Sequence, residues 1–131
     1  MSHVDGVLAA YAAFSAGDRD GALQAFAEDV EWHQAEGLPH GGVYHGVDEV
    51  RRHVFGPLET AWWDAFDARL EEIYDAGKAV VARGRYVGRA KSTGRELDVP
   101  FVHVWEFGDG ERATRFRQYL DTQGWNDALR S

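Results

Sequence analysis

His103 is the residue whose surroundings most clearly require a chemical explanation. It stands in the middle of the run Val99-Pro100-Phe101-Val102-His103-Val104-Trp105, in which every neighbour is apolar. An ionisable side chain in an apolar strand needs a hydrogen-bond partner or a function. Because histidine titrates near neutral pH, His103 could donate to an oxyanion or carry a proton. A core histidine bonded to a neighbouring side chain is the alternative, and the sequence leaves both open.

Asp121 is the second candidate for acid-base chemistry, and it follows Tyr119-Leu120 at the end of the last predicted strand. A carboxylate near an aromatic cavity loses hydration, which raises its pKa towards a range useful for proton transfer. Asp121-Thr122 is also a good helix N-cap, which explains the aspartate without any substrate. The two interpretations are compatible.

The distance between these two candidates can be estimated from the turn that joins their strands, Gly108-Asp109-Gly110. Counting back from this turn puts His103 opposite Arg115 or Phe116. Residue 121 then lies about 17 Å further along a flat sheet. We therefore expect His103 and Asp121 to act on one ligand from different walls of a pocket, without a direct hydrogen bond.

Aromatic side chains come from every predicted element, and they are numerous for a chain of 131 residues. Rings combined with a few convergent polar groups are typical of sites for apolar ligands. We expect a pocket for a small apolar molecule, lined by Tyr11, Phe14, Trp32, Gln34, Tyr44, Trp62, Tyr86, Phe101, Trp105, Phe116 and Gln118.

Metal and cofactor sites find little support. The chain has no cysteine, and His33, His40 and His45 have no familiar ligand spacing, so we interpret the latter two as surface-loop histidines. Neither Gly108-Asp109-Gly110 nor the stretch 84–94 has the strand, glycine loop and helix of a nucleotide site. We expect no metal and no cofactor.

The elements that must position these residues begin with helices. Ser2 is a plausible N-cap for a first helix that Gly17 ends, and Asp18 or Asp20 can cap a short second helix. Residues 30–34 alternate as a strand does, and residues 37–42 form a loop. A third helix opens near Asp48 and is broken or kinked at Gly56-Pro57.

The second half of the chain reads as an antiparallel meander. Strands are predicted over 65–74, 79–90, 95–107 and 111–120, each separated from the next by a turn composition. A short helix then runs through Leu129. Strand alternation turns Phe101, His103 and Trp105 inward, and it turns Arg115, Arg117 and Tyr119 outward. Helices ahead of an antiparallel sheet give an α+β fold.

This order resembles the SnoaL-like and ketosteroid isomerase-like branch of the nuclear transport factor 2-like superfamily. The resemblance covers nearly the whole chain and is carried by Gly17-Asp18, the run 28–33, Tyr44-His45-Gly46 and Tyr119-Leu120-Asp121. It implies a cone-shaped α+β fold in which helices pack on a curved antiparallel sheet. It also implies a pocket on the concave face and a homodimer formed through the other face.

The resemblance suggests roles for individual residues. His103 aligns with the protonated acid that binds the enolate oxygen in ketosteroid isomerases, and Asp121 with the proton-transfer aspartate of SnoaL-like cyclases. The isomerase's general base falls at Gln34, which cannot act as one, and its helix tyrosine lies one residue from Tyr11. Limonene epoxide hydrolases need a second carboxylate on the strand that here runs 80–87, which contains none.

Three functions remain open at this stage. The first is a cofactor-independent isomerase or cyclase of an apolar carbonyl compound, with Asp121 as acid and base and with His103 and Gln118 at the oxyanion. The second is a non-catalytic binding protein that uses the same pocket. The third is a scaffold dimer whose pocket is simply filled. Residues 1–131 form one expected domain with a net charge of −8, which argues against a nucleic-acid partner. With no membrane-spanning stretch, we expect a cytoplasmic protein without a membrane partner, and the resemblance implies that it is a homodimer.

Overall fold

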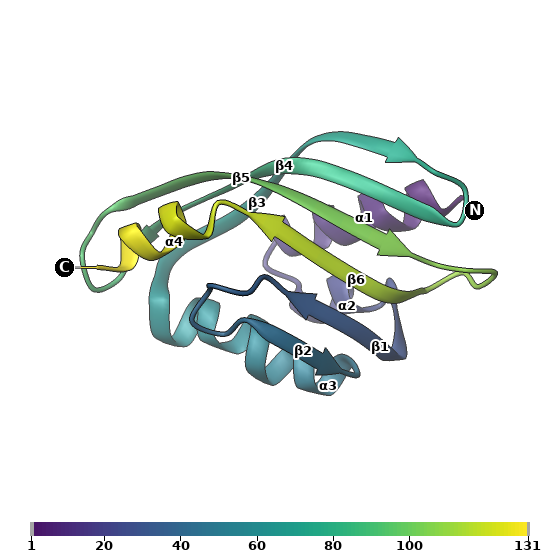
Figure 1. Cartoon of the computed structure of the whole chain (residues 1–131), viewed down its shortest axis with the longest axis horizontal. Coiled ribbons are helices and arrows are strands. Elements are labelled where there is room, and N and C mark those ends of the chain that lie inside the picture. The colour runs from purple at the N-terminus through teal and green to yellow at the C-terminus, as the bar shows by residue number, and fades with distance from the viewer. Residues whose placement is uncertain (1, 131) are drawn as a thin grey trace.

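The computed structural model describes residues 2–130. Its elements are α1 (His3–Ser15), α2 (Arg19–Leu23), β1 (Phe26–Gln34), β2 (Gly42–His45), α3 (Val47–Glu49), two π-helical segments (Val50–Phe55 and Leu58–Trp62), β3 (Trp63–Asp75), β4 (Ala79–Ala90), β5 (Glu96–Glu106), β6 (Ala113–Leu120) and α4 (Thr122–Leu129). The two halves of the chain meet in one sheet, and the helices pack on it (Figure 1).

The helix ends follow the capping pattern of the sequence. The Ser2 hydroxyl accepts the Asp5 N–H at 3.2 Å, and the Asp18 carboxylate accepts the Gly21 N–H at 2.8 Å. Gly17 adopts a φ of +84°, a left-handed conformation that glycine takes without strain, and this ends α1. The predicted caps at Ser2 and Asp18 are therefore confirmed.

The sheet has six strands in the order β2-β1-β6-β5-β4-β3. All neighbours are antiparallel except β1 and β6, which run parallel. The sequence predicts a purely antiparallel sheet and no strand at residues 42–45, so both expectations are wrong in these details. β2 has only four residues and pairs through one edge with β1, and so short a strand shows too little alternation to be recognised.

The meander strands agree with their predicted ranges to within two residues at each end. The register between β5 and β6 does not: His103 lies opposite Gln118, not Arg115 or Phe116. The reason is the length of the connection. β5 ends at Glu106 and β6 begins at Ala113, so six residues link the strands where a three-residue turn was assumed.

The helical stretch of residues 47–62 differs from the single helix expected. It begins as one α-helical turn and continues as two π-helical segments that meet at Gly56-Pro57. The helix is not broken at this pair, because Gly56 and Pro57 both keep helical backbone angles, with φ of −52° and −61°. Val50, Val54, Phe55 and Leu58 turn inward from this stretch and are buried.

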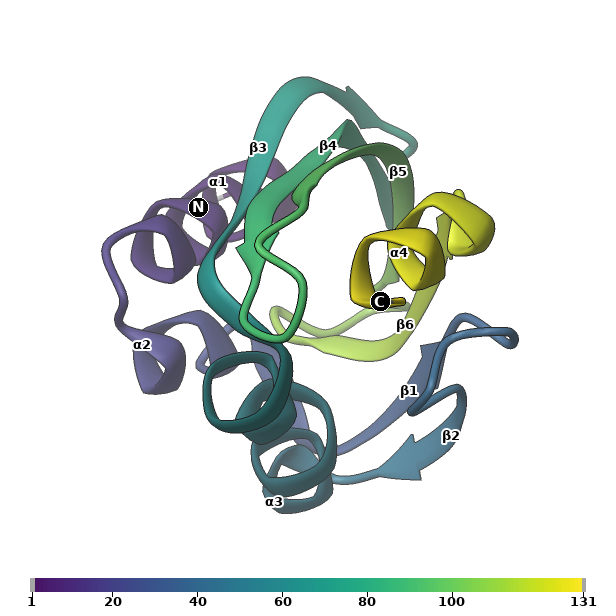
Figure 2. The ribbon, with the colours of Figure 1, turned by 90° about the vertical axis from the view of Figure 1, so that its left-hand side faces the viewer.

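Curvature of the sheet creates the space for a site. Seen from its end, the sheet is strongly curved. Helix α4 lies beside β5 and β6, and α1 lies beside β3 (Figure 2). Helix α1 packs against β3 and β4, and α4 packs against β4 and β5. The predicted alternation is confirmed, since Phe101, His103 and Trp105 are buried and Tyr119 is exposed.

Candidate ligand-binding site

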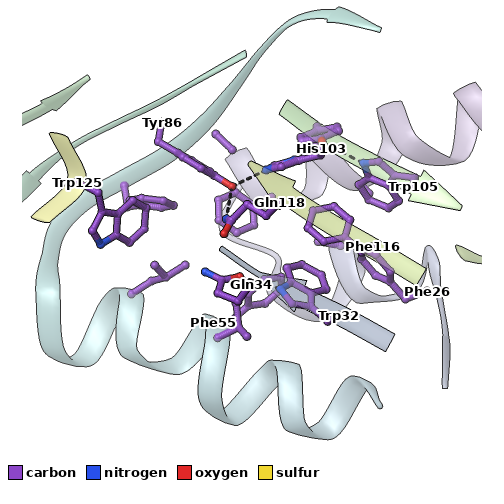
Figure 3. A pocket seen from close by; sticks show the side chains of 18 residues that line it. Phe26, Trp32, Gln34, Phe55, Tyr86, His103, Trp105, Phe116, Gln118 and Trp125 are labelled. Carbon is purple, nitrogen blue, oxygen red and sulfur yellow. Dashed lines mark hydrogen bonds between the residues drawn. The ribbon is translucent and has the colours of Figure 1, made fainter. Parts of the chain in front are cut away.

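An apolar cavity of about 60 Å³ lies between the concave sheet face and the helices. Its polar lining groups belong mainly to Tyr11, Gln34, Tyr86, His103 and Gln118, and they come from α1, β1, β4, β5 and β6 (Figure 3). Rings and aliphatic side chains form the rest, namely Ala10, Phe14, Ala22, Phe26, Trp32, Val54, Phe55, Leu58, Phe66, Ala68, Trp105, Phe116 and Trp125. Among residues 2–130, no Asp, Glu, Lys or Arg lines the cavity.

His103 is held between two tyrosine hydroxyls. Tyr11 Oη lies 2.5 Å from its Nδ1, and Tyr86 Oη lies 2.5 Å from its Nε2. The Phe101 ring stacks on the imidazole at a centroid distance of 4.1 Å. Burial lowers the pKa of His103 to about 3, because an imidazolium would lose its hydration here. The ring is therefore neutral at physiological pH.

Each tyrosine oxygen also makes a second hydrogen bond, in which it is the acceptor. The Trp105 Nε1–H donates to Tyr11 Oη at 3.1 Å, and the Gln118 amide donates to Tyr86 Oη at 2.7 Å. The orientation of the Gln118 amide is fixed, because its Oε1 accepts the backbone N–H of Ala35 at 3.1 Å. Burial raises the pKa of both tyrosines, so both keep their protons.

The hydrogens in this cluster outnumber the acceptors. A neutral imidazole has one N–H and one bare nitrogen. His103 therefore accepts from one tyrosine and donates to the other, whose oxygen then accepts twice. That second tyrosine keeps an O–H that has no acceptor among residues 2–130. The donor can be Tyr11 or Tyr86, depending on the histidine tautomer, and both residues line the cavity.

Gln34 forms a further polar group on the cavity wall. Its Oε1 accepts the Trp32 Nε1–H at 2.8 Å, and its Nε2 lies 2.9 Å from His40 Nε2. His40 is buried, with 8% of its surface exposed, so its interpretation as a surface-loop residue is wrong. The loop after β1 folds inward and also buries Leu38, which a glycine-rich composition does not reveal.

The family model described as "SnoaL-like domain" matches residues 7–116. The chain belongs to the SnoaL-like family. An NTF2-like protein from Burkholderia thailandensis E264 is 30% identical, with a TM-score of 0.93 over 100% of this chain and 99% of that one.

Two further solved structures are similar to this SnoaL-like domain. An NTF2-like protein of unknown function from Burkholderia pseudomallei K96243 is 30% identical, with a TM-score of 0.89 and all of both chains covered. TerC, co-crystallised with polyporic acid, is 27% identical, with a TM-score of 0.87 and 98% of each chain covered. No curated protein matches the chain.

Most of the predicted pocket residues of the SnoaL-like domain lie on the cavity. These are Tyr11, Phe14, Trp32, Gln34, Tyr86, His103, Trp105, Phe116 and Gln118. Three others lie outside the lining. The Phe101 ring stacks on His103 and also contacts the Tyr86 ring. Trp62 packs on His40, with 4.7 Å between ring centroids, and the Tyr44 hydroxyl donates to the His40 carbonyl at 2.7 Å.

Asp121 is exposed and does not line the cavity of the SnoaL-like domain. Its carboxylate accepts the Gly124 N–H at 3.0 Å and caps α4, as the capping interpretation predicts. The structure therefore does not bring Asp121 together with His103.

Sequence reasoning missed several lining residues, among them Phe26, Phe55, Phe66 and Trp125. Phe55 follows Val54 and precedes Leu58 at helical spacing, which is the signal that could have placed it on an inward face. Trp125 lies in the tail helix, 1% exposed, and its approach to the sheet depends on tertiary packing.

In the described part of the chain, no three His, Cys, Asp or Glu residues are grouped so that they could hold a metal ion. Within residues 2–130 there is also no helix that is both long enough and apolar enough to cross a membrane.

Proposed function

We propose that this domain binds a small apolar molecule through a carbonyl oxygen and stabilises negative charge on that oxygen. The observation that carries the proposal is the surplus O–H of the Tyr11–His103–Tyr86 cluster. A buried donor without an acceptor costs about 1–3 kcal/mol, and a ligand oxygen would recover this free energy.

The neighbouring groups strengthen this donor. Gln118 uses one hydrogen of its amide for Tyr86, which leaves the other free to bind the same ligand oxygen. Neutral donors fixed in an apolar cavity stabilise a developing oxyanion strongly, because they need no reorganisation and no water competes. Such an arrangement favours an enol or enolate form over the ketone.

The lining also defines the body of the ligand. Rings surround the polar cluster, so a flat apolar compound would contact them on both faces. Pockets for drug-sized ligands are several times larger than this cavity, at about 300–1,000 Å³. The cavity therefore accepts a compact group, or one end of a larger molecule after side chains move. TerC, similar in structure, is known with polyporic acid, which supports a small-molecule site.

Polarisation of a carbonyl is the electrophilic half of an isomerase or cyclase reaction, and this is the enzymatic form of the proposal. The cavity wall, within residues 2–130, carries no carboxylate, and His103 is neutral with both nitrogens occupied. Proton removal from carbon would therefore fall to water or to a group of the substrate. The same observation favours a second candidate, a protein that only binds its ligand.

Binding is tested with acetophenone, an aromatic ketone, by titration of tryptophan fluorescence. Saturable quenching is expected, because Trp32, Trp105 and Trp125 line the cavity. The Tyr11→Phe/Tyr86→Phe double variant, which removes both hydroxyls, should weaken binding about tenfold. Tyr119→Phe, at an exposed tyrosine, is the matched control. A flat titration of the unaltered protein contradicts the proposal.

The enzymatic form is tested separately by exchange of the acetophenone methyl protons in D₂O, followed by proton NMR. Exchange accelerated by the protein and lost in the double variant supports an isomerase or cyclase. Saturable binding with exchange at the rate of buffer alone supports the binding protein.

A further inference from the structure

Three unpartnered donors lie in an aromatic cluster around Trp125, which lines the cavity, whereas the other two members, His40 and Trp63, are not lining residues. Trp125 and Trp105 occupy opposite ends of the drawn site, and the Trp125 indole nitrogen turns away from the hydrogen bonds of His103 (Figure 3). This nitrogen is buried and has no hydrogen-bond partner among residues 2–130. Trp63 Nε1 is also buried and unpartnered there, and its ring contacts Trp125 at 5.1 Å between centroids.

His40 adds a third donor, and its tautomer follows from its neighbours. An indole nitrogen only donates, so Trp32 fixes Gln34 with its oxygen towards the indole and its NH₂ towards His40. His40 Nε2 must then accept. Burial lowers the pKa of His40 to about 4, so the ring is neutral and carries its hydrogen on Nδ1.

His40 Nδ1 is itself buried without a partner in the described chain. The imidazole lies parallel to the Trp125 indole, with 6.0 Å between ring centroids. Three buried N–H groups from three segments of the chain thus lie in one aromatic cluster that contains no acceptor for them. Native structures rarely leave one such group unpaired, and each needs a specific explanation.

We propose that the cluster of His40, Trp63 and Trp125 is a second ligand subsite that takes an acceptor oxygen. The inference rests on the proposed function and narrows its ligand class. The preferred ligand would be an apolar ring compound with oxygen functions at two opposite ends, one bound by the Tyr11–His103–Tyr86 cluster and the other by His40 and Trp125. The two subsites adjoin, because the Trp125 ring contacts the Tyr86 ring edge-on, with 5.7 Å between their centroids.

The test compares two probes of matched shape. 1,4-Diacetylbenzene has a carbonyl at each end, whereas 4-isopropylacetophenone has one carbonyl and an isopropyl group in place of the second acetyl group. Isothermal titration of the unaltered protein should give about fivefold to tenfold tighter binding of the diketone, from the added hydrogen bond. This exceeds the statistical advantage of its two equivalent ends.

Variants locate the effect. His40→Phe and Trp125→Phe each keep a ring and remove an N–H, so each should reduce the ratio of diketone affinity to monoketone affinity. Trp125→Phe leaves the Gln34 contact intact if His40→Phe disturbs folding. Trp62→Phe is the control, because Trp62 touches His40 but its nitrogen is not among the buried unpartnered atoms.

Proton–nitrogen NMR of the indole groups gives an independent readout. The Trp125 N–H resonance should shift downfield with the diketone and much less with the monoketone. Equal affinity for both probes, or a preference that survives both substitutions, overturns the second subsite and leaves the proposed function intact. Failure of both probes to bind overturns the proposed function together with the subsite.

Discussion

Replacing Tyr86 with phenylalanine tests the buried network directly. The substitution keeps the ring but removes an oxygen that pairs with His103 and accepts from Gln118. Two buried polar groups are then left without partners. The substitution also removes the surplus O–H of the cluster, so the net change is one more unpaired group, and at about 1–3 kcal/mol for such a group the free energy of unfolding should fall by about 1–3 kcal/mol. This is a large part of the 5–15 kcal/mol that is typical of a domain.

Urea denaturation followed by far-ultraviolet circular dichroism measures this loss, with an unchanged slope as the sign that unfolding remains two-state. Tyr11→Phe should have a comparable effect, because it leaves Trp105 and His103 Nδ1 unpaired. Both substitutions touch one histidine, so the double variant should lose less than the sum of the single losses. Tyr119→Phe should change stability by less than about 0.5 kcal/mol. A Tyr86→Phe loss as small as the Tyr119→Phe loss would refute the network.

Three further outcomes are expected. Because the folded-state pKa values of His103 and His40 lie at about 3 and 4, below the ordinary 6.5, the unfolded chain takes up these protons first. The contribution of the two neutral histidines to stability should therefore be fully present above pH 6.5. The free energy of unfolding should fall as the pH drops towards 4, by up to about 1.4 kcal/mol per pH unit for each histidine. In urea titrations, His103→Phe should make this pH dependence weaker. Asp121→Ala should lower stability by about 1 kcal/mol through loss of the α4 cap while acetophenone binding persists. Loss of proton exchange in Asp121→Asn with binding retained would restore its catalytic role. We also propose that a second copy of the chain covers the outer sheet face, where Val43 and Tyr119 are 47% and 54% exposed beside a hollow of about 450 Å³. Sedimentation should show a dimer, and Tyr119→Lys should dissociate it. A monomer of the unaltered protein at micromolar concentration contradicts this proposal.

The outer face also shows how its outward-pointing arginines are paired. Arg115 and Arg117 were expected to point away from the pocket, and they do. They already have partners within the chain, since Arg115 Nε lies 2.7 Å from Glu31 and Arg117 Nε lies 3.1 Å from Glu106. A dimer interface therefore depends more on the exposed Val43 and Tyr119 than on charge pairing between copies.

Local patterns in the sequence predicted the features that depend on few residues. Alternation in β5 placed His103 and Trp105 inward, and composition located the caps of α1 and α2. These features follow from strand pleating and from the unpaired N–H groups at a helix start, both of which act within a few residues.

Features that depend on distant contacts could not be read in this way. The partners of His103 lie 92 and 17 residues before it in the chain, and no spacing rule connects them. Burial of His40 requires Trp62 and Trp125 to pack around a loop whose composition alone indicates exposure. The predicted register between β5 and β6 was wrong for a related reason, because the length of the connection after β5 depends on backbone geometry.

The central claim is that a tyrosine O–H of the His103 cluster binds a ligand carbonyl. Isotope-edited infrared spectroscopy of acetophenone labelled with carbon-13 at the carbonyl measures this bond directly. In the unaltered protein the bound C=O stretch should lie at lower frequency than in an alkane solvent, and the Tyr11→Phe/Tyr86→Phe variant should return it towards the alkane value. A bound carbonyl whose frequency equals the alkane value in the unaltered protein would show that the cluster donates nothing to the ligand.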